Sequence, residues 1–192
     1  MTEARQPITD AKRLKALAHP LRWKLIKLIG SDETATATRC SEVLGESVAS
    51  CSYHLNMLAK YGFVEEAEGG QGREKPWKLT SRRQSVDTDS LEGDAKLAAE
   101  AASEAFLETE FDEIRTQLRR GDLEPKEWQD IIGTIAATLW LTPDEAATLR
   151  QQFENMVEQY EERWDKAELR PEGARQTRLF LASFLNQRYP GH

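Results

Sequence analysis

The feature that most constrains the fold is a change of pattern at Gly62. Before it, Ser47–Tyr61 carries apolar side chains at helical spacing. These side chains repeat at i, i+4 and i+7: Cys51, Leu55 and Leu58. After it, Phe63–Ala67 and Pro76–Thr80 are extended runs that flank a loop with three glycines. The sequence therefore predicts a helix followed directly by a β-hairpin with a glycine-rich tip.

Three shorter helices are predicted upstream of that helix. They run from Asp10 to Leu17, from Pro20 to about Ile29 and from Thr38 to Leu44. The first is expected to stop before Pro20, because the residue that precedes a proline is pushed out of the α region. Gly30 is expected to end the second helix and Gly45 the third, since glycine is common just after a helix. Ser47 is then a good N-cap for the fourth.

The second half of the chain is predicted to be rich in helices. After a polar linker at residues 81–90, the expected helices are Leu91 to about Arg119, Pro125–Ile132 and one that opens at Thr142. Thr142 and Glu145 have the spacing of a capping box. Thr134–Leu141 is rich in residues that favour strands, and Gln176–Leu185 fits either a second strand or a helix.

The predicted fold class is α+β, mainly helical, with two domains. Residues 1–83 would form a winged helix-turn-helix, and residues 91–192 a helix-rich C-terminal domain with one or two strands. Charge supports this division, because the net charge of -7 is unevenly distributed. Residues 1–83 hold 14 Lys and Arg against 10 Asp and Glu, or +4, while the rest hold 12 against 23, or -11. Only the first part is expected to approach a polyanion without strong repulsion.

Other protein classes find no support in the sequence. No apolar run approaches the roughly 18 residues that span a bilayer, and the N-terminus does not resemble a signal peptide, so a cytoplasmic protein without membrane contact is expected. The two cysteines, Cys40 and Cys51, are expected to be buried as small hydrophobic residues rather than to act as a thiol sensor. No catalytic motif is present and no enzyme activity is expected: the loop at residues 69–72 lacks the Lys-Ser/Thr of a phosphate-binding loop.

A helix-turn-helix followed by a hairpin suits the major groove of DNA. A helix can enter that groove and present its N-terminal side chains to base edges. If Cys51, Leu55 and Leu58 point to the core, the opposite face of the helix is small and mostly polar. That face holds Ala49, Ser50, Tyr53, Asn56 and Met57, with Ser52 at its edge. The free backbone N–H groups at Ser47 can also bind a phosphate.

Two stretches of sequence resemble the ArsR-type transcriptional regulators. One is Leu17–Arg22 (LAHPLR), followed by a helix rich in Leu and Ile. The other is Ser47–Leu58 (SVASCSYHLNML), which runs on into Lys60–Val64 (KYGFV), where Phe63 stands in place of the usual Leu. The resemblance covers about residues 10–80.

This resemblance implies a homodimeric winged-helix protein that binds an inverted-repeat operator in double-stranded DNA. Such proteins are usually repressors that an effector releases. The candidate DNA-binding residues, carried over by position or placed on the exposed faces, are Ser47, Val48, Ala49, Ser50, Ser52, Tyr53, His54, Asn56, Gln71, Arg73 and Lys75. Among them Ser47 and His54 would lie near the DNA backbone, and Arg73 and Lys75 would meet phosphate or the minor groove. For His54, a role in packing remains open beside a phosphate contact.

The resemblance departs from the metal-sensing members of the family. Those members place a Cys-x-Cys pair in the third helix, where this chain has Thr36 and Thr38, while Cys40 falls on a core position. Threonine cannot replace a thiolate as a ligand for a soft metal, so neither a metal nor a cofactor is expected. The acidic half resembles an extension found on a subset of ArsR-like regulators. Its role in dimerisation, or in enclosing a small apolar effector among aromatic residues such as Trp140 and Trp164, stays open.

Two other functions remain compatible with the sequence. Some winged helices bind proteins instead of nucleic acid, so an adaptor without specific DNA binding is the alternative. A small-molecule-binding protein whose ligand shifts the DNA-binding equilibrium is compatible with the main interpretation.

Overall fold

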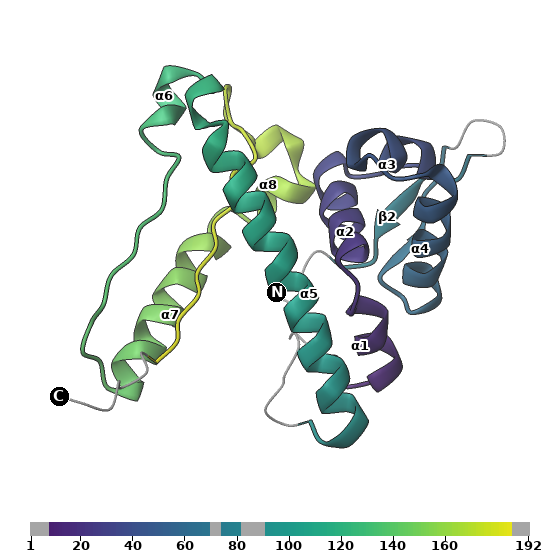
Figure 1. Cartoon of the computed structure of the whole chain (residues 1–192). Coiled ribbons are helices and arrows are strands. Elements are labelled where there is room, and N and C mark those ends of the chain that lie inside the picture. Colours follow the sequence, from purple (N-terminus) through teal and green to yellow (C-terminus); the bar gives the residue numbers. More distant parts are fainter. Residues whose placement is uncertain (1–7, 70–73, 82–90, 186–192) are drawn as a thin grey trace. The chain divides into compact units, whose positions relative to one another are not determined.

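The structure is a computed structural model that describes residues 8–69, 74–81 and 91–185 (Figure 1). Its contacts divide the chain into two compact units, residues 1–134 and 135–192. The described part of the first unit contains α1 (Ala11–Leu17), α2 (Pro20–Asp32), α3 (Ala37–Leu44), α4 (Val48–Lys60), β1 (Val64–Glu66), β2 (Trp77–Leu79), α5 (Gly93–Arg119), the 3₁₀ turn η1 (Gly121–Leu123) and α6 (Lys126–Gln129). The predicted fold class, α+β and mainly helical, is confirmed.

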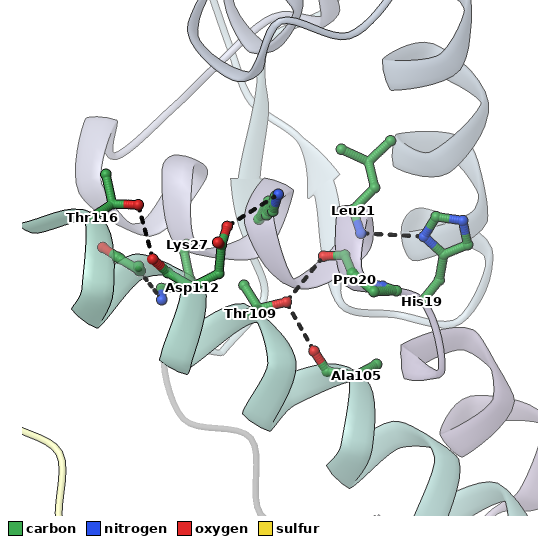
Figure 2. Close-up of polar contacts among 10 residues, drawn as sticks. His19, Pro20, Leu21, Lys27, Ala105, Thr109, Asp112 and Thr116 are labelled. Atoms are coloured by element: carbon green, nitrogen blue, oxygen red, sulfur yellow. Dashed lines mark hydrogen bonds and ion pairs between the residues drawn. The ribbon is translucent and has the colours of Figure 1, made fainter.

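The first four helices begin where short-range chemistry predicts, and α1, α3 and α4 also end there. Asp10 caps α1, since its Oδ1 accepts from the backbone N–H of Arg13 at 2.8 Å. His19 caps α2, and its Nδ1 accepts from the N–H of Leu21 at 3.2 Å (Figure 2). Gly45 ends α3 with a φ of +70°, a left-handed conformation that glycine adopts at no steric cost. The predicted boundaries of α1, α3 and α4 are therefore confirmed to within one residue.

The prediction that Gly30 ends α2 is wrong. The helix continues through this glycine to Asp32. A Cβ at position 30 would lie 3.2 Å from Cδ1 of Leu79 on β2. The missing side chain lets the hairpin lie close against the helix, and this contact explains the glycine better than a helix end does.

The hairpin forms as predicted, with shorter strands. β1 and β2 pair antiparallel in the register Val64↔Leu79, Glu65↔Lys78 and Glu66↔Trp77. Ala35, between α2 and α3, extends the pairing: its N–H and C=O bond the C=O and N–H of Trp77 at 3.0 and 2.9 Å. Both Ala35 and Trp77 are buried, so the hairpin is joined to the helical core through this bridge.

The long helix α5 packs on α1 and α2 within the first unit (Figure 1). Its buried stripe consists of small residues: Ala98, Ala99, Ala102 and Ala105. Further along, Phe106 meets Trp23 edge to face with ring centroids 5.0 Å apart. Small side chains allow helices to approach closely, so α5 covers the core that α1 and α2 leave open.

Polar contacts also join α5 to α2. Figure 2 shows the hydroxyl of Thr109 between the carbonyl oxygens of Ala105, at 2.8 Å, and of Pro20, at 3.5 Å. Lys27 lies 3.0 Å from Oε1 of Glu110 and also pairs with Glu113. Glu110 is only 1% exposed, so pairing with Lys27 compensates the charge of its buried carboxylate.

The second unit contains α7 (Pro143–Glu158), α8 (Glu162–Asp165) and the 3₁₀ turn η2 (Ala167–Leu169). The predicted capping box is confirmed, because Thr142 and Glu145 each accept from the other's backbone N–H. The prediction of a strand at residues 134–141 is wrong, and so is that of a second strand or a helix at residues 176–185, since both segments are irregular. β1 and β2 make the only sheet among the described residues. A strand needs a neighbour to pair with, and no described segment supplies one.

A membrane span is not found. Over the described part of the chain, none of the helices combines the length and the apolar character that crossing a bilayer requires.

Candidate nucleic-acid interface

The turn between α3 and α4 is held by side chains at both of its ends. The hydroxyl of Ser41 donates to the carbonyl of Glu46 at 2.6 Å. Ser47 Oγ accepts from the N–H of Ser50 at 3.1 Å and caps α4. The remaining N–H groups of the first turn of α4 have no partner within the helix, as at every helix N-terminus. The turn therefore presents an ordered start of α4 at the surface.

α4 has one buried and one exposed face, as predicted. Cys51, Leu55 and Leu58 are fully buried. The candidate residues on the outer face are exposed or half-buried: Ser47, Val48, Ala49, Tyr53 and Asn56 are exposed, and Ser50 and Ser52 are half-buried. The structure thus brings seven of the candidate residues together on one surface, which we call the α4 face.

His54 does not lie on the α4 face. It is 8% exposed, and its Nδ1 accepts from Nε of Arg22 at 3.2 Å. Burial lowers the pKa of His54, and nearby His19 and Arg22 lower it further. A neutral imidazole with Nδ1 as acceptor carries its proton on Nε2. Of the two roles left open for this residue, packing is the one that these contacts describe.

Arg22 is a buried cation that the sequence alone did not single out. Besides His54, it bonds the carbonyl of Ala16 at 2.8 Å, so it connects the end of α1 to the middle of α4. The His19 ring packs against the His54 ring in a tilted arrangement, with 4.4 Å between the ring centroids. The signal was present in the LAHPLR and SYHL stretches, whose polar residues meet here. This polar cluster fixes how α4 sits on α1 and α2.

Two polar side chains on the α4 face have defined orientations. Asn56 Nδ2 donates to the carbonyl of Ser52 at 2.7 Å. A carbonyl only accepts, so the amide nitrogen must face it and Oδ1 is turned away from this bond. Tyr53 is 59% exposed, and its ring meets His54 edge to face at 5.1 Å. An acceptor and a phenol are therefore held at the surface.

We call the β1–β2 hairpin the wing. In its described part, basic side chains are paired with acidic ones. Lys75 pairs with Glu66, and Lys78 pairs with Glu65 at 3.1 Å. Glu74 accepts from Oγ1 of Thr38 at 2.6 Å, which ties the hairpin to α3. Two candidate residues, Gln71 and Arg73, lie outside the described residues. A phosphate that approached Lys75 would have to compete with a carboxylate.

The residues that correspond to a metal site have other uses. Thr36 caps α3, with its Oγ1 accepting from the N–H of Arg39 at 3.2 Å. Burial raises the pKa of the Cys40 thiol to about 11, and it also raises that of Cys51. Both cysteines are free and buried, which confirms their prediction as small hydrophobic residues. Among the described residues, no three His, Cys, Asp or Glu side chains are grouped so as to hold a metal ion.

Comparison with known proteins identifies one domain. A family model described as a helix-turn-helix domain matches residues 17–67, from the end of α1 through β1. No curated protein matches the chain. The matched region contains α2, α3, the turn and α4, so the chain carries a helix-turn-helix domain with α4 in the place of the second helix.

Proposed function

We propose that this chain is a sequence-specific, DNA-binding transcriptional regulator. The observation that carries the proposal is the α4 face, which is mostly small and polar and lies on the second helix of a helix-turn-helix domain. In such domains the second helix lies in the major groove with its N-terminal residues at the base edges. Ser47, Val48, Ala49, Ser50, Ser52, Tyr53 and Asn56 would then meet DNA.

The finer parts of the proposal rest on the resemblance to ArsR-type regulators. They are a homodimer, an inverted-repeat operator, repression and control by a small molecule in the acidic C-terminal half, within the cytoplasm. The charge distribution supports DNA binding by the first part of the chain alone, because residues 1–83 carry +4 and the remainder -11. An acidic second half would stay away from the DNA backbone.

The direct test is selection of bound sequences from a random pool of double-stranded DNA with the full chain. A regulator of this kind selects a defined site, and a dimer selects a two-fold symmetric one. Tyr53→Ala and Arg73→Ala should each weaken binding to that site. A base contact costs about 1–3 kcal/mol, and a lost phosphate contact reduces the salt slope by about one.

Arg150→Ala is the matched control for Arg73→Ala. Arg150 is an exposed arginine on α7, paired with Glu154 at 3.3 Å, so its loss should change neither the affinity nor the salt slope. If Tyr53→Ala and Arg73→Ala both leave operator affinity unchanged, the DNA surface is assigned wrongly. If the pool yields no preferred sequence at moderate salt, the adaptor function replaces the regulator.

Glu46 offers a variant with the opposite sign. Its exposed carboxylate stands beside the N-terminus of α4, where a phosphate would approach. Glu46→Gln should therefore strengthen DNA binding and do so most at low salt, because the repulsion is electrostatic. In an adaptor that does not bind DNA, Glu46→Gln would have no effect on DNA binding at any salt concentration.

The effector is tested separately with a thermal-shift screen across broad metabolite classes. A ligand that stabilises the chain and also changes its affinity for the selected DNA supports the sensing role. The absence of any hit would count against it.

A further inference from the structure

We propose that α4 reads A·T base pairs, and that the methyl groups of Val48 and Ala49 contact the C5-methyl groups of thymine in the major groove. This inference rests on the proposed function, since it requires α4 to enter the groove. It goes further by stating which bases the α4 face fits and which side chains discriminate between them.

Cationic side chains are absent from all but the last residue of α4. From Val48 to Ala59 the helix carries no lysine and no arginine. Lys60 stands at the C-terminal end, with its ammonium 5.6 Å from the Tyr61 ring centre. Guanine presents two acceptors, O6 and N7, in the major groove, and bidentate Arg or Lys is the commonest way to bind them. The α4 face has no side chain of that kind where bases would lie.

Apolar side chains are exposed at the start of α4. Val48 is 46% exposed and Ala49 is exposed, side by side in the first turn of α4. Valine is a weak helix former, and an exposed valine contributes little to the core, so the methyl groups of Val48 are available for contact with a partner. Thymine alone places a methyl group in the major groove, and apolar side chains recognise it there.

The orientation of Asn56 also favours particular bases. Its amide nitrogen is bound to the carbonyl of Ser52, which leaves Oδ1 as the outward acceptor. An acceptor fits the amino group of adenine or cytosine and does not fit the acceptor edge of guanine. Methyl contacts and an outward acceptor together favour thymine and adenine.

Glu46 is the side chain that could carry a different specificity. A carboxylate can accept from the N4 amino group of cytosine. Glu46 precedes the N-cap of α4 and is exposed, so Glu46→Gln belongs in the test.

The experiment starts from the sequence selected in the random pool. Each thymine of one half-site is replaced singly by deoxyuridine, which lacks only the C5-methyl group, and affinity is measured by mobility shift. The wild-type chain should lose about fourfold in affinity at the thymines that Val48 and Ala49 contact, the effect of one buried methyl group. In Val48→Ala, replacing the thymine that Val48 contacts by uracil should cost almost no affinity. The affinity of this variant for the uracil DNA should equal that of the wild-type chain.

Two variants serve as controls. Val48→Thr keeps one of the two methyl groups and should retain part of the discrimination. Val43→Ala removes a valine of equal exposure, 46%, from α3 instead of α4 and should leave the thymine-to-uracil ratio unchanged. Thermal unfolding of each variant shows that the domain is intact.

Two results would overturn the inference while the proposed function stands. One is half-sites rich in G·C pairs, whether or not Glu46→Gln removes that preference, and the other is selective binding that ignores every thymine-to-uracil change. Failure of the proposed function looks different, because no preferred DNA sequence would then be found.

Discussion

The winged-helix part of the chain, residues 8–81, and the segment from Ile135 to Leu185 both contain helices that the sequence predicts, but they differ in burial. In the first, Leu14, Leu25 and Leu55 are fully buried. In the second, none of the described side chains is buried, and Ile135 and Trp140 are almost fully exposed. Helix signals are local and act in both regions, whereas burial needs partners from elsewhere in the chain. Helices therefore form from local sequence in both regions, whereas a buried core is found only in the first of the two described regions.

A leucine-to-alanine substitution made in each region should give the largest difference in stability between the two. Leu55→Ala should lower the free energy of unfolding by about 2–5 kcal/mol, because it leaves a cavity at a fully buried site. Leu149→Ala, at a leucine that is 45% exposed on α7, should cost well under about 1 kcal/mol. Urea denaturation of both variants measures the difference. Equal losses would show that α7 is buried by a partner in solution.

Ion pairs give the second contrast. Lys27→Met should cost roughly 2–3 kcal/mol, since it leaves the Glu110 carboxylate buried at 1% exposure, and the partial exposure of Lys27 keeps the loss below that of a fully buried pair. Arg150→Met removes an exposed i,i+4 pair with Glu154 and should cost no more than about 0.5 kcal/mol. Denaturation at two salt concentrations distinguishes the pairs, because only the exposed one is strongly screened. Similar costs would contradict the difference in burial.

The capping box of α7 gives a smaller effect. Thr142→Ala should weaken the start of this helix by about 1 kcal/mol, the usual contribution of an N-cap. Because the described residues of this region have no buried core, the loss should appear as reduced helicity by circular dichroism rather than as global unfolding. Thr142→Ser is the control and should keep the helicity. A drop in the unfolding midpoint of the whole chain would show that α7 is coupled to the winged helix.

The smallest effect is a pH dependence that belongs to the first region. The pKa of His54 is lowered by burial, so the folded state prefers the neutral ring more than the unfolded state does. The stabilisation is fully present above the unfolded pKa of about 6.5 and is lost as the pH falls below it. His54→Asn supplies an acceptor for Arg22 that does not titrate and should flatten the profile of stability between pH 7 and 5. An unchanged slope would assign the dependence to other groups.

Local signals in the sequence were sufficient to predict most of the helix boundaries and the hairpin. Ser47, Gly45 and Thr142 act on neighbours within a few residues, so their effect is visible in the sequence. The α4 face followed from the positions of Cys51 and Leu55 on the helix. These predictions needed no knowledge of the rest of the fold.

What escaped prediction depends on contacts between distant residues. His54 fits either a phosphate contact or the core on sequence grounds, and only its bond to Arg22, 32 positions away, shows it packed. The irregular segments at residues 134–141 and 176–185 have the composition of strands but lack a described neighbour. The contact of α5 with α1 could not be predicted for the same reason, because a stripe of alanines does not specify the helix against which it packs.

Gly30 makes the sequence of α2 depend on that of β2, because a methyl group at this position would meet Leu79. Alanine there would be the better helix former by about 1 kcal/mol, yet its Cβ would press on Leu79 at 3.2 Å. Positions 30 and 79 are thus expected to vary together among descendants of this chain, with a larger residue at 30 accepted where a shorter one occupies 79. The position of the hairpin is therefore coupled to the sequence of α2 through the close contact of Gly30 with Leu79.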